Sequence, residues 1–71
     1  MPRYYFSLVD DRPVDDFGGQ ILADDETASR VATRLARELR EVRPELSGKN
    51  YVVIASDNEA VEVCRVPLDL N

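Results

Sequence analysis

The first hydrophobic positions of the chain alternate with a period of two. Segment 3–9, "RYYFSLV", is rich in aromatic and branched residues, and this pattern predicts a β-strand. Its two sides consist of Tyr4, Phe6 and Leu8 on the one hand and of Tyr5, Ser7 and Val9 on the other. We expect the first set to face the core, which leaves Tyr5 and Val9 on the opposite face of the sheet.

The alternation breaks after this strand. Segment 10–19, "DDRPVDDFGG", combines Asp, Pro and Gly, which are typical of loops and turns. The pair Gly18-Gly19 indicates a turn that needs a positive φ. The short segment 20–23, "QILA", is interpreted as the second arm of an irregular hairpin.

A helical period follows and predicts an α-helix over 25–43. The apolar positions with this spacing are Ala28, Val31, Ala32, Leu35, Leu39 and Val42. Asp24 or Asp25 is the expected N-cap, because a carboxylate accepts the free amide hydrogens of the first turn. Pro44 ends the helix, since proline disfavours helical geometry in the residue before it. Three charged pairs at i, i+4 support it, namely Glu26–Arg30, Arg34–Glu38 and Arg37–Glu41.

Two more strands are predicted, over 51–56 and 60–66. The apolar run in "YVVIAS" indicates that the first of them is buried on both faces. Asn58 lies in the turn between the strands, and asparagine tolerates a left-handed backbone.

The last strand has an ambiguous phase. Val61 and Val63 fall on one side, whereas Cys64 and Val66 follow the other alternation, and a β-bulge could reconcile the two. Pro67 has no amide hydrogen for a ladder, so we expect that end of the strand at an edge or outside the sheet.

These elements predict a single domain over residues 1–71 of the α+β class. The order is ββαββ, with a four-stranded, mainly antiparallel sheet and one helix packed on one face. A helix over 25–43 would be about 28 Å long, while a seven-residue strand spans about 23 Å. The last turn of the helix is therefore expected to overhang the sheet.

Four segments together resemble a family of small bacterial domains of unknown function. They are "MPRYYFSLVDD", "DDFGGQILADDETASRVA", "LSGKNYVVIASDN" and the closing "VPL". The most specific part is the opening Met-Pro-Arg followed by two aromatics and Phe. The resemblance covers nearly the whole chain and implies a stand-alone ββαββ-like domain, but it implies no activity. Members often carry His after the Phe, where this chain has Ser7.

Charge and composition narrow the range of functions. The net charge of −5 argues against nucleic acid and against anionic membranes, since both rely on Lys and Arg. No apolar run approaches the ~20 residues that span a bilayer, and the first residues lack the features of a signal peptide. The single Cys64 permits no internal disulfide, so we expect a reducing cytoplasm.

Three Asp-Asp pairs within segment 8–26 raise the question of a cation site. An EF-hand loop that starts at Asp11 would need an oxygen ligand at Pro13, and one that starts at Asp15 would need it at Phe17. We therefore interpret the pairs as turn residues and a helix cap, and expect no metal. Gly18-Gly19 matches no phosphate-binding motif either, so no cofactor is expected.

Little in the chain points to catalysis. There is no His, and Cys64 lies in a predicted strand without an evident base beside it. The serines likewise lack a visible partner, so we expect a protein that is not an enzyme.

The remaining functional hypothesis is a protein-interaction module, which in its simplest form binds a second copy of itself. Its expected partner face is the sheet face without the helix and includes Tyr5, Val9, Tyr51 and Val53. The alternative is an accessory module that binds an acidic partner or nucleic acid through the arginine face of the helix. That face consists of Arg30, Arg34, Arg37 and Arg40.

Overall fold

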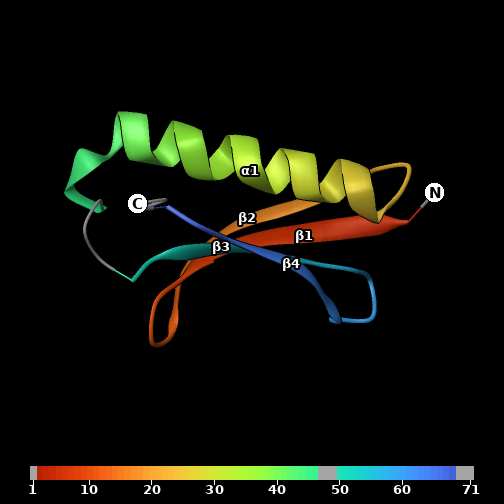
Figure 1. The fold of residues 1–71 in the computed structure, drawn as a ribbon. Helices are drawn as coiled ribbons and strands as arrows, with labels where there is room; N and C mark the ends of the chain where they lie inside the picture. The colour runs from red at the N-terminus through yellow and green to blue at the C-terminus, as the bar shows by residue number, and fades with distance from the viewer. Residues whose placement is uncertain (1, 47–49, 69–71) are drawn as a thin grey trace.

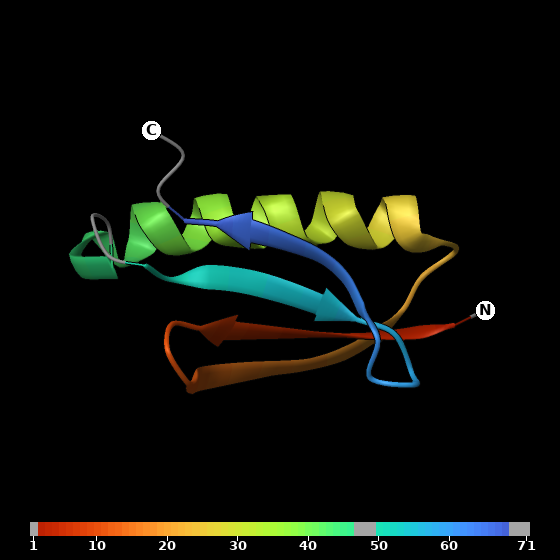
Figure 2. The ribbon, with the colours of Figure 1, turned by 60° about the horizontal axis from the view of Figure 1, so that its bottom comes forward.

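The computed structural model describes residues 2–46 and 50–68 of the 71-residue chain. Its elements, in order, are β1 (Arg3–Val9), β2 (Pro13–Ile21), α1 (Asp25–Val42), the short 3₁₀ helix η1 (Pro44–Leu46), β3 (Val52–Ser56) and β4 (Glu62–Pro67). The strands form one antiparallel sheet in the order β2-β1-β3-β4, and α1 lies across one face (Figures 1 and 2). The predicted α+β fold with the order ββαββ is confirmed.

Strand β1 lies inside the sheet between β2 and β3, and its alternation is as predicted. Tyr4, Phe6 and Leu8 are buried, whereas Tyr5 is exposed. The buried core that they join consists of Tyr4, Phe6, Leu8, Ala28, Ala32, Ala36, Val53, Ala55 and Leu68.

Helix α1 begins and ends close to the predicted positions. The N-cap is Asp24, whose carboxylate accepts a hydrogen bond from the backbone N–H of Thr27 at 2.9 Å. The expectation that Val42 faces the core is wrong, because its side chain is 77% exposed. With 18 residues, α1 is about 27 Å long, while the five-residue β3 on which it packs spans only about 17 Å, so α1 is longer than this strand.

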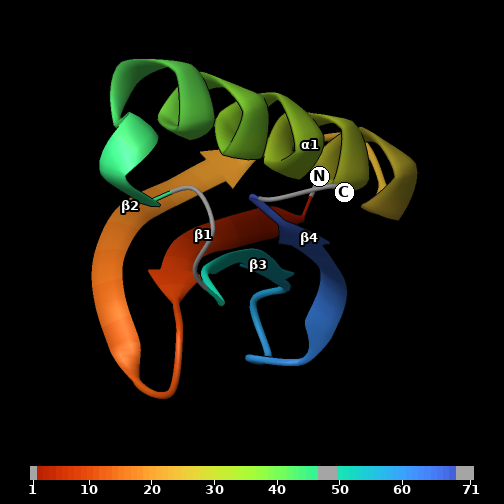
Figure 3. The same cartoon turned by 60° about the vertical axis from the view of Figure 1, so that its left-hand side comes forward.

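The buried side of α1 is formed by the three alanines Ala28, Ala32 and Ala36, of which Ala36 was not predicted. Small side chains let a helix approach a sheet closely, and α1 runs close to β3 and β4. The larger Val31 and Leu35 are half-buried at the side of the helix. The sheet curves beneath the helix (Figure 3), and α1 lies toward its β4 edge, where it packs on β3 and β4.

Strand β2 corrects the prediction most. The segment read as a loop followed by a short arm over 20–23 is a nine-residue strand, and the connection from β1 occupies only residues 10–12. Two irregularities in register explain the loop-like composition: Phe17 and Gly18 together face Phe6, and an extra residue lies between Pro13 and Asp15. Gly18 has φ +82°, a conformation that glycine adopts without strain.

Strands β3 and β4 resolve the ambiguous phase of the last strand. Ala55 pairs with Cys64 and Ser56 with Glu62, so Val63 is the extra residue of the expected bulge. β4 is an edge strand that ends at Pro67, as predicted.

The turn between β3 and β4 differs from its prediction in one residue. The left-handed conformation belongs to Ala60, with φ +64°, and not to Asn58. Asp57 shapes this turn, because its carboxylate accepts hydrogen bonds from the backbone N–H groups of Glu59 and Val61.

Candidate functional site

The open face is the sheet face away from α1, and the structure changes its predicted membership. Val53 pairs with the buried Leu8 and therefore faces the helix, with no exposed surface, so its assignment to this face is wrong. Tyr51 precedes β3 and packs against the core. The apolar run of β3 does not show by itself which residues face the helix; only the register with β1 decides this. The β3 residues that lie on the open face are Val52 and Ile54, since they pair with Val9 and Ser7.

Tyr5 has a structural role on the open face. A Cβ atom on Gly19, its partner in β2, would lie 2.9 Å from the Cε1 atom of the Tyr5 ring. The ring therefore packs over Gly19, which has no side chain of its own, and supplies the contacts that this position of the strand would otherwise lack. Tyr5 is 43% exposed and lines a shallow hollow of about 420 Å³ with Ser56, Asn58 and Ala60.

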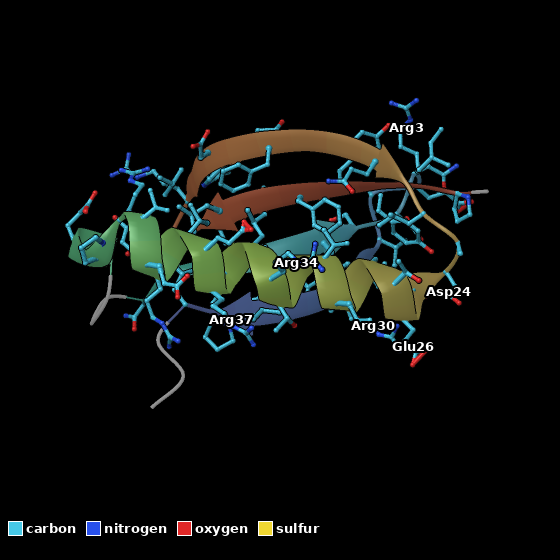
Figure 4. All side chains as sticks on the ribbon, turned by 90° about the horizontal axis from the view of Figure 1, so that it is seen from above. Arg3, Asp24, Glu26, Arg30, Arg34 and Arg37 are labelled. Carbon is cyan, nitrogen blue, oxygen red and sulfur yellow. The ribbon has the colours of Figure 1, made fainter. Side chains whose placement is uncertain are left out.

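The predicted arginine face is divided by the structure. Arg30, Arg34 and Arg37 follow one another along the outside of α1 and line a shallow hollow of about 380 Å³ (Figure 4). We call these three residues the arginine surface. Arg40 is half-buried and turns away, donating from Nη1 to the carbonyl oxygen of Leu68 at 3.4 Å.

Only one of the three predicted helical charge pairs forms among the described residues. Glu26 Oε1 lies 3.6 Å from Arg30 Nη2, with both side chains largely exposed. An exposed pair of this kind contributes little to stability. The guanidinium groups of Arg34 and Arg37 thus have no carboxylate within ion-pair distance in the part of the chain that the structure describes.

The aspartates bind local backbone groups. Four aspartate carboxylates accept hydrogen bonds from nearby backbone N–H groups. The donors are Arg12 for Asp10, Asp16 for Asp15, Gly18 for Asp16 and Thr27 for Asp24. The Thr27 N–H and hydroxyl groups hold the pKa of Asp24 below its usual value. The cap at Asp24 is as predicted, whereas Asp15 and Asp16 lie within a strand rather than beside a turn. Among residues 2–46 and 50–68, no three His, Cys, Asp or Glu side chains gather as a metal site would require.

Tyr4 connects the sheet to the start of the helix. Its hydroxyl donates a 2.6 Å hydrogen bond to Asp25 Oδ1. This bond, together with burial and the nearby carboxylates, raises the pKa of Tyr4 to about 12. The phenol therefore stays protonated and fixes the first turn of α1 above β1.

The displacement of α1 leaves a groove between the helix and β2, and sequence reasoning did not identify it. We call it the α1–β2 groove, and it is lined by Phe6, Phe17, Gln20, Val31, Arg34, Leu35 and Glu38. Phe6 forms the floor, Phe17 and Gln20 the β2 side, and Val31 and Leu35 the helix side. Arg34 and Glu38 complete the helix side with opposite charges.

The groove combines apolar and polar side chains, so it suits a segment of another molecule that carries both kinds. Its volume of about 230 Å³ lies below the ~300–1,000 Å³ of typical small-molecule pockets. Phe17 is 37% exposed although it lies next to apolar neighbours. The sequence feature that could have indicated the groove is Phe17, an aromatic residue within a polar segment. Only the position of α1 shows that Phe17 lines a groove.

The described residues contain no helix that is both long and apolar enough to cross a membrane. Comparison with curated proteins gives no match, and comparison with solved structures gives none. A comparison with protein families matches residues 3–69 to the domain of unknown function DUF6894. This match spans β1 to β4 and agrees with the resemblance to a small family of unknown function. The chain belongs to the DUF6894 family.

Proposed function

We propose that this domain is a non-enzymatic, cytoplasmic protein-interaction module and that the α1–β2 groove is its contact surface. One observation carries the proposal: all nine residues of β2 are exposed, and the large apolar side chain of Phe17 is 37% exposed at the side of the groove. A large aromatic side chain that a small domain leaves exposed beside a groove is a candidate anchor for a partner. The groove beside this strand is concave, and its lining combines apolar side chains with the polar Gln20, Arg34 and Glu38.

The contact is made by side chains rather than by addition of a strand to β2. An edge strand attracts other strands through its unpaired backbone groups. Here the N–H groups of Asp16 and Gly18 already donate to neighbouring carboxylates, Pro13 has no N–H, and two irregularities interrupt the ladder. These features protect the edge, so the groove offers the better binding surface.

Two substitutions on the same strand test this proposal. Gln20 pairs with the buried Tyr4, so Ile21 points to the opposite face of β2 from the groove. Phe17→Lys should remove partners that the intact domain enriches from cells of its source, as measured by quantitative mass spectrometry. Ile21→Lys introduces the same charge at a 57% exposed position and should retain them.

Circular dichroism has to show that both variants keep the native fold. Loss of the same partners from both variants, or from neither, would contradict the groove as contact surface.

Self-association through the open face is a second candidate function. The observation that favours it is a row of apolar side chains across two central strands, where Val9 pairs with Val52 and Ile54 lies next along β3. A two-fold axis would bring this row against its own copy. Light scattering at high protein concentration should then give a dimer, and Tyr5→Asp should give a monomer with native circular dichroism. A monomeric unmodified protein would exclude this candidate.

A further inference from the structure

We propose that the occupant of the α1–β2 groove is an amphipathic helix of a partner protein, which lies over β1 and β2 alongside α1. The inference rests on the proposed function, because it takes the groove as the contact surface. It adds the conformation and the charge pattern of the bound segment.

The width of the sheet leaves room for a second helix. Four strands are together about 19 Å wide, while one helix with its side chains is about 10 Å across. α1 runs close to β3 and β4, so the helix-side face above β2 is left open. In Figure 4, which looks down on the helix, β2 lies clear of α1 on one side. One helix therefore covers about half of the sheet.

The apolar part of the groove comes from two elements, while Gln20, Arg34 and Glu38 make the rest of its lining polar. Phe6 and Phe17 come from the sheet, and Val31 and Leu35 come from the neighbouring helix. An incoming helix would thus contact a sheet below and a helix beside it, as helices within a two-layer α+β domain do. The groove holds one or two apolar side chains, which on a helix are supplied by residues spaced i, i+3 or i, i+4.

Charge specifies how such a helix is recognised. Asp15 pairs with Leu8 and so lies on the helix side of β2, toward the Pro13 end. Glu38 lies on α1 toward the same end, one turn beyond Arg34. A partner helix that fits carries Lys or Arg near Asp15 and Glu38 and an acidic residue near Arg34. Opposite charges at these positions fix the direction of the helix more than they add affinity.

A second copy of this chain does not supply the helix. α1 is the single α-helix among the described residues, and its alanine side is buried against its own sheet. Its outer side carries the arginine surface, which lacks the apolar residues that the groove requires. The occupant is therefore a different protein segment.

The test uses random 16-residue peptides displayed on phage, selected on the immobilised 71-residue domain. Enriched peptides should show apolar residues at i, i+3 or i+4, and i+7. As free peptides they should gain helical circular dichroism on binding and shift the amide resonances of Phe17, Val31 and Leu35. Phe17→Lys should weaken binding about tenfold or more, as expected for a central contact, while Ile21→Lys should change it less than about twofold.

The charge pattern gives an independent arm of the same experiment. Selection on Glu38→Lys should exchange the basic residues of the enriched peptides for acidic ones at the matching position. Enrichment of extended peptides that still depend on Phe17 would overturn the helix and leave the groove as contact surface. Peptides insensitive to Phe17→Lys would overturn both, and a failure to enrich any peptide would overturn the helical occupant.

Discussion

The Tyr4 hydroxyl predicts how stability depends on alkaline pH. Its pKa is raised from 10.0 to about 12 in the folded protein, so the stabilising contribution is present in full below pH 10. It is lost as the pH rises from 10 through 12, because the unfolded chain releases the proton first. Tyr4→Phe should be less stable at neutral pH but should lose less stability over this interval. Denaturant midpoints between pH 8 and 12 measure both effects.

The absorbance of tyrosinate provides the control for this prediction. The titration curve of the folded protein should contain a component near pH 12 that Tyr4→Phe removes. A late component that survives the substitution would assign the raised pKa to another tyrosine.

Ala60 and Gly18 form a matched pair for backbone strain, since both have a positive φ. A left-handed conformation costs a non-glycine residue roughly 1–2 kcal/mol, whereas glycine adopts it freely. Gly18→Ala should lower the free energy of unfolding by about this amount, because a Cβ there meets no atom within 4 Å and only the backbone is affected. Ala60→Gly should raise it by up to about 1 kcal/mol, reduced by the greater freedom of unfolded glycine.

The two changes in the free energy of unfolding need not be equal in size, but Gly18→Ala has to lower it and Ala60→Gly has to raise it. Chemical denaturation measures both variants under the same conditions. Destabilisation by Ala60→Gly would show that the Ala60 methyl group makes contacts worth more than the strain.

At the scale of elements, truncating the apolar side chains of α1 should lower the free energy of unfolding by different amounts along the helix. Burying a large apolar side chain completely is worth about 1.5–3 kcal/mol, and Leu35 is only half-buried. Leu35→Ala should therefore lower the free energy of unfolding by about 1–2 kcal/mol, less than the ~2–5 kcal/mol of a fully buried leucine. Val42→Ala, at the exposed end of the same helix, should change it by less than about 0.5 kcal/mol.

Denaturant midpoints at a common slope provide the comparison. A larger effect at Val42 than at Leu35 would mean that the last turn of α1 packs on the domain.

The elements differ in how far the sequence predicts them, and the reason is physical. β1 and α1 each have one buried side, so their hydrophobic periods of two and of about 3.6 are visible in the sequence. β2 is exposed on both faces and has no such period. Its Pro, Asp and Gly residues are loop signals elsewhere, but here they protect an edge strand and form its irregularities.

The candidate site depends on relations that no local pattern contains. Phe17 and Leu35 line one groove because α1 lies toward β4 and leaves a space between itself and β2. Val53 was assigned to the wrong face for a similar reason, since its orientation depends on the register with Leu8. Arg30, Arg34 and Arg37 are neighbours on α1, as their helical spacing predicts. Arg40 was expected on the same face but turns toward Leu68.

At the scale of the whole molecule, net charge predicts behaviour on an anionic matrix. The charge of −5 repels phosphate and sulfate groups, while the arginine surface attracts them locally. We expect the protein to pass through a heparin column at about 0.15 M salt, where the Debye length is about 8 Å. Retention that falls steeply with salt and disappears in Arg34→Glu would instead favour an acidic or nucleic-acid partner.

The half-covered sheet also has a consequence for the lifetime of the protein in a cell. A domain of 71 residues buries a smaller share of its surface than a larger one, so we expect its free form to be only marginally stable and to open to proteases. A helix that binds only the folded state would raise the melting temperature with its concentration. Molecules without their partner would then be degraded first, and the amount of this protein would follow the amount of the partner.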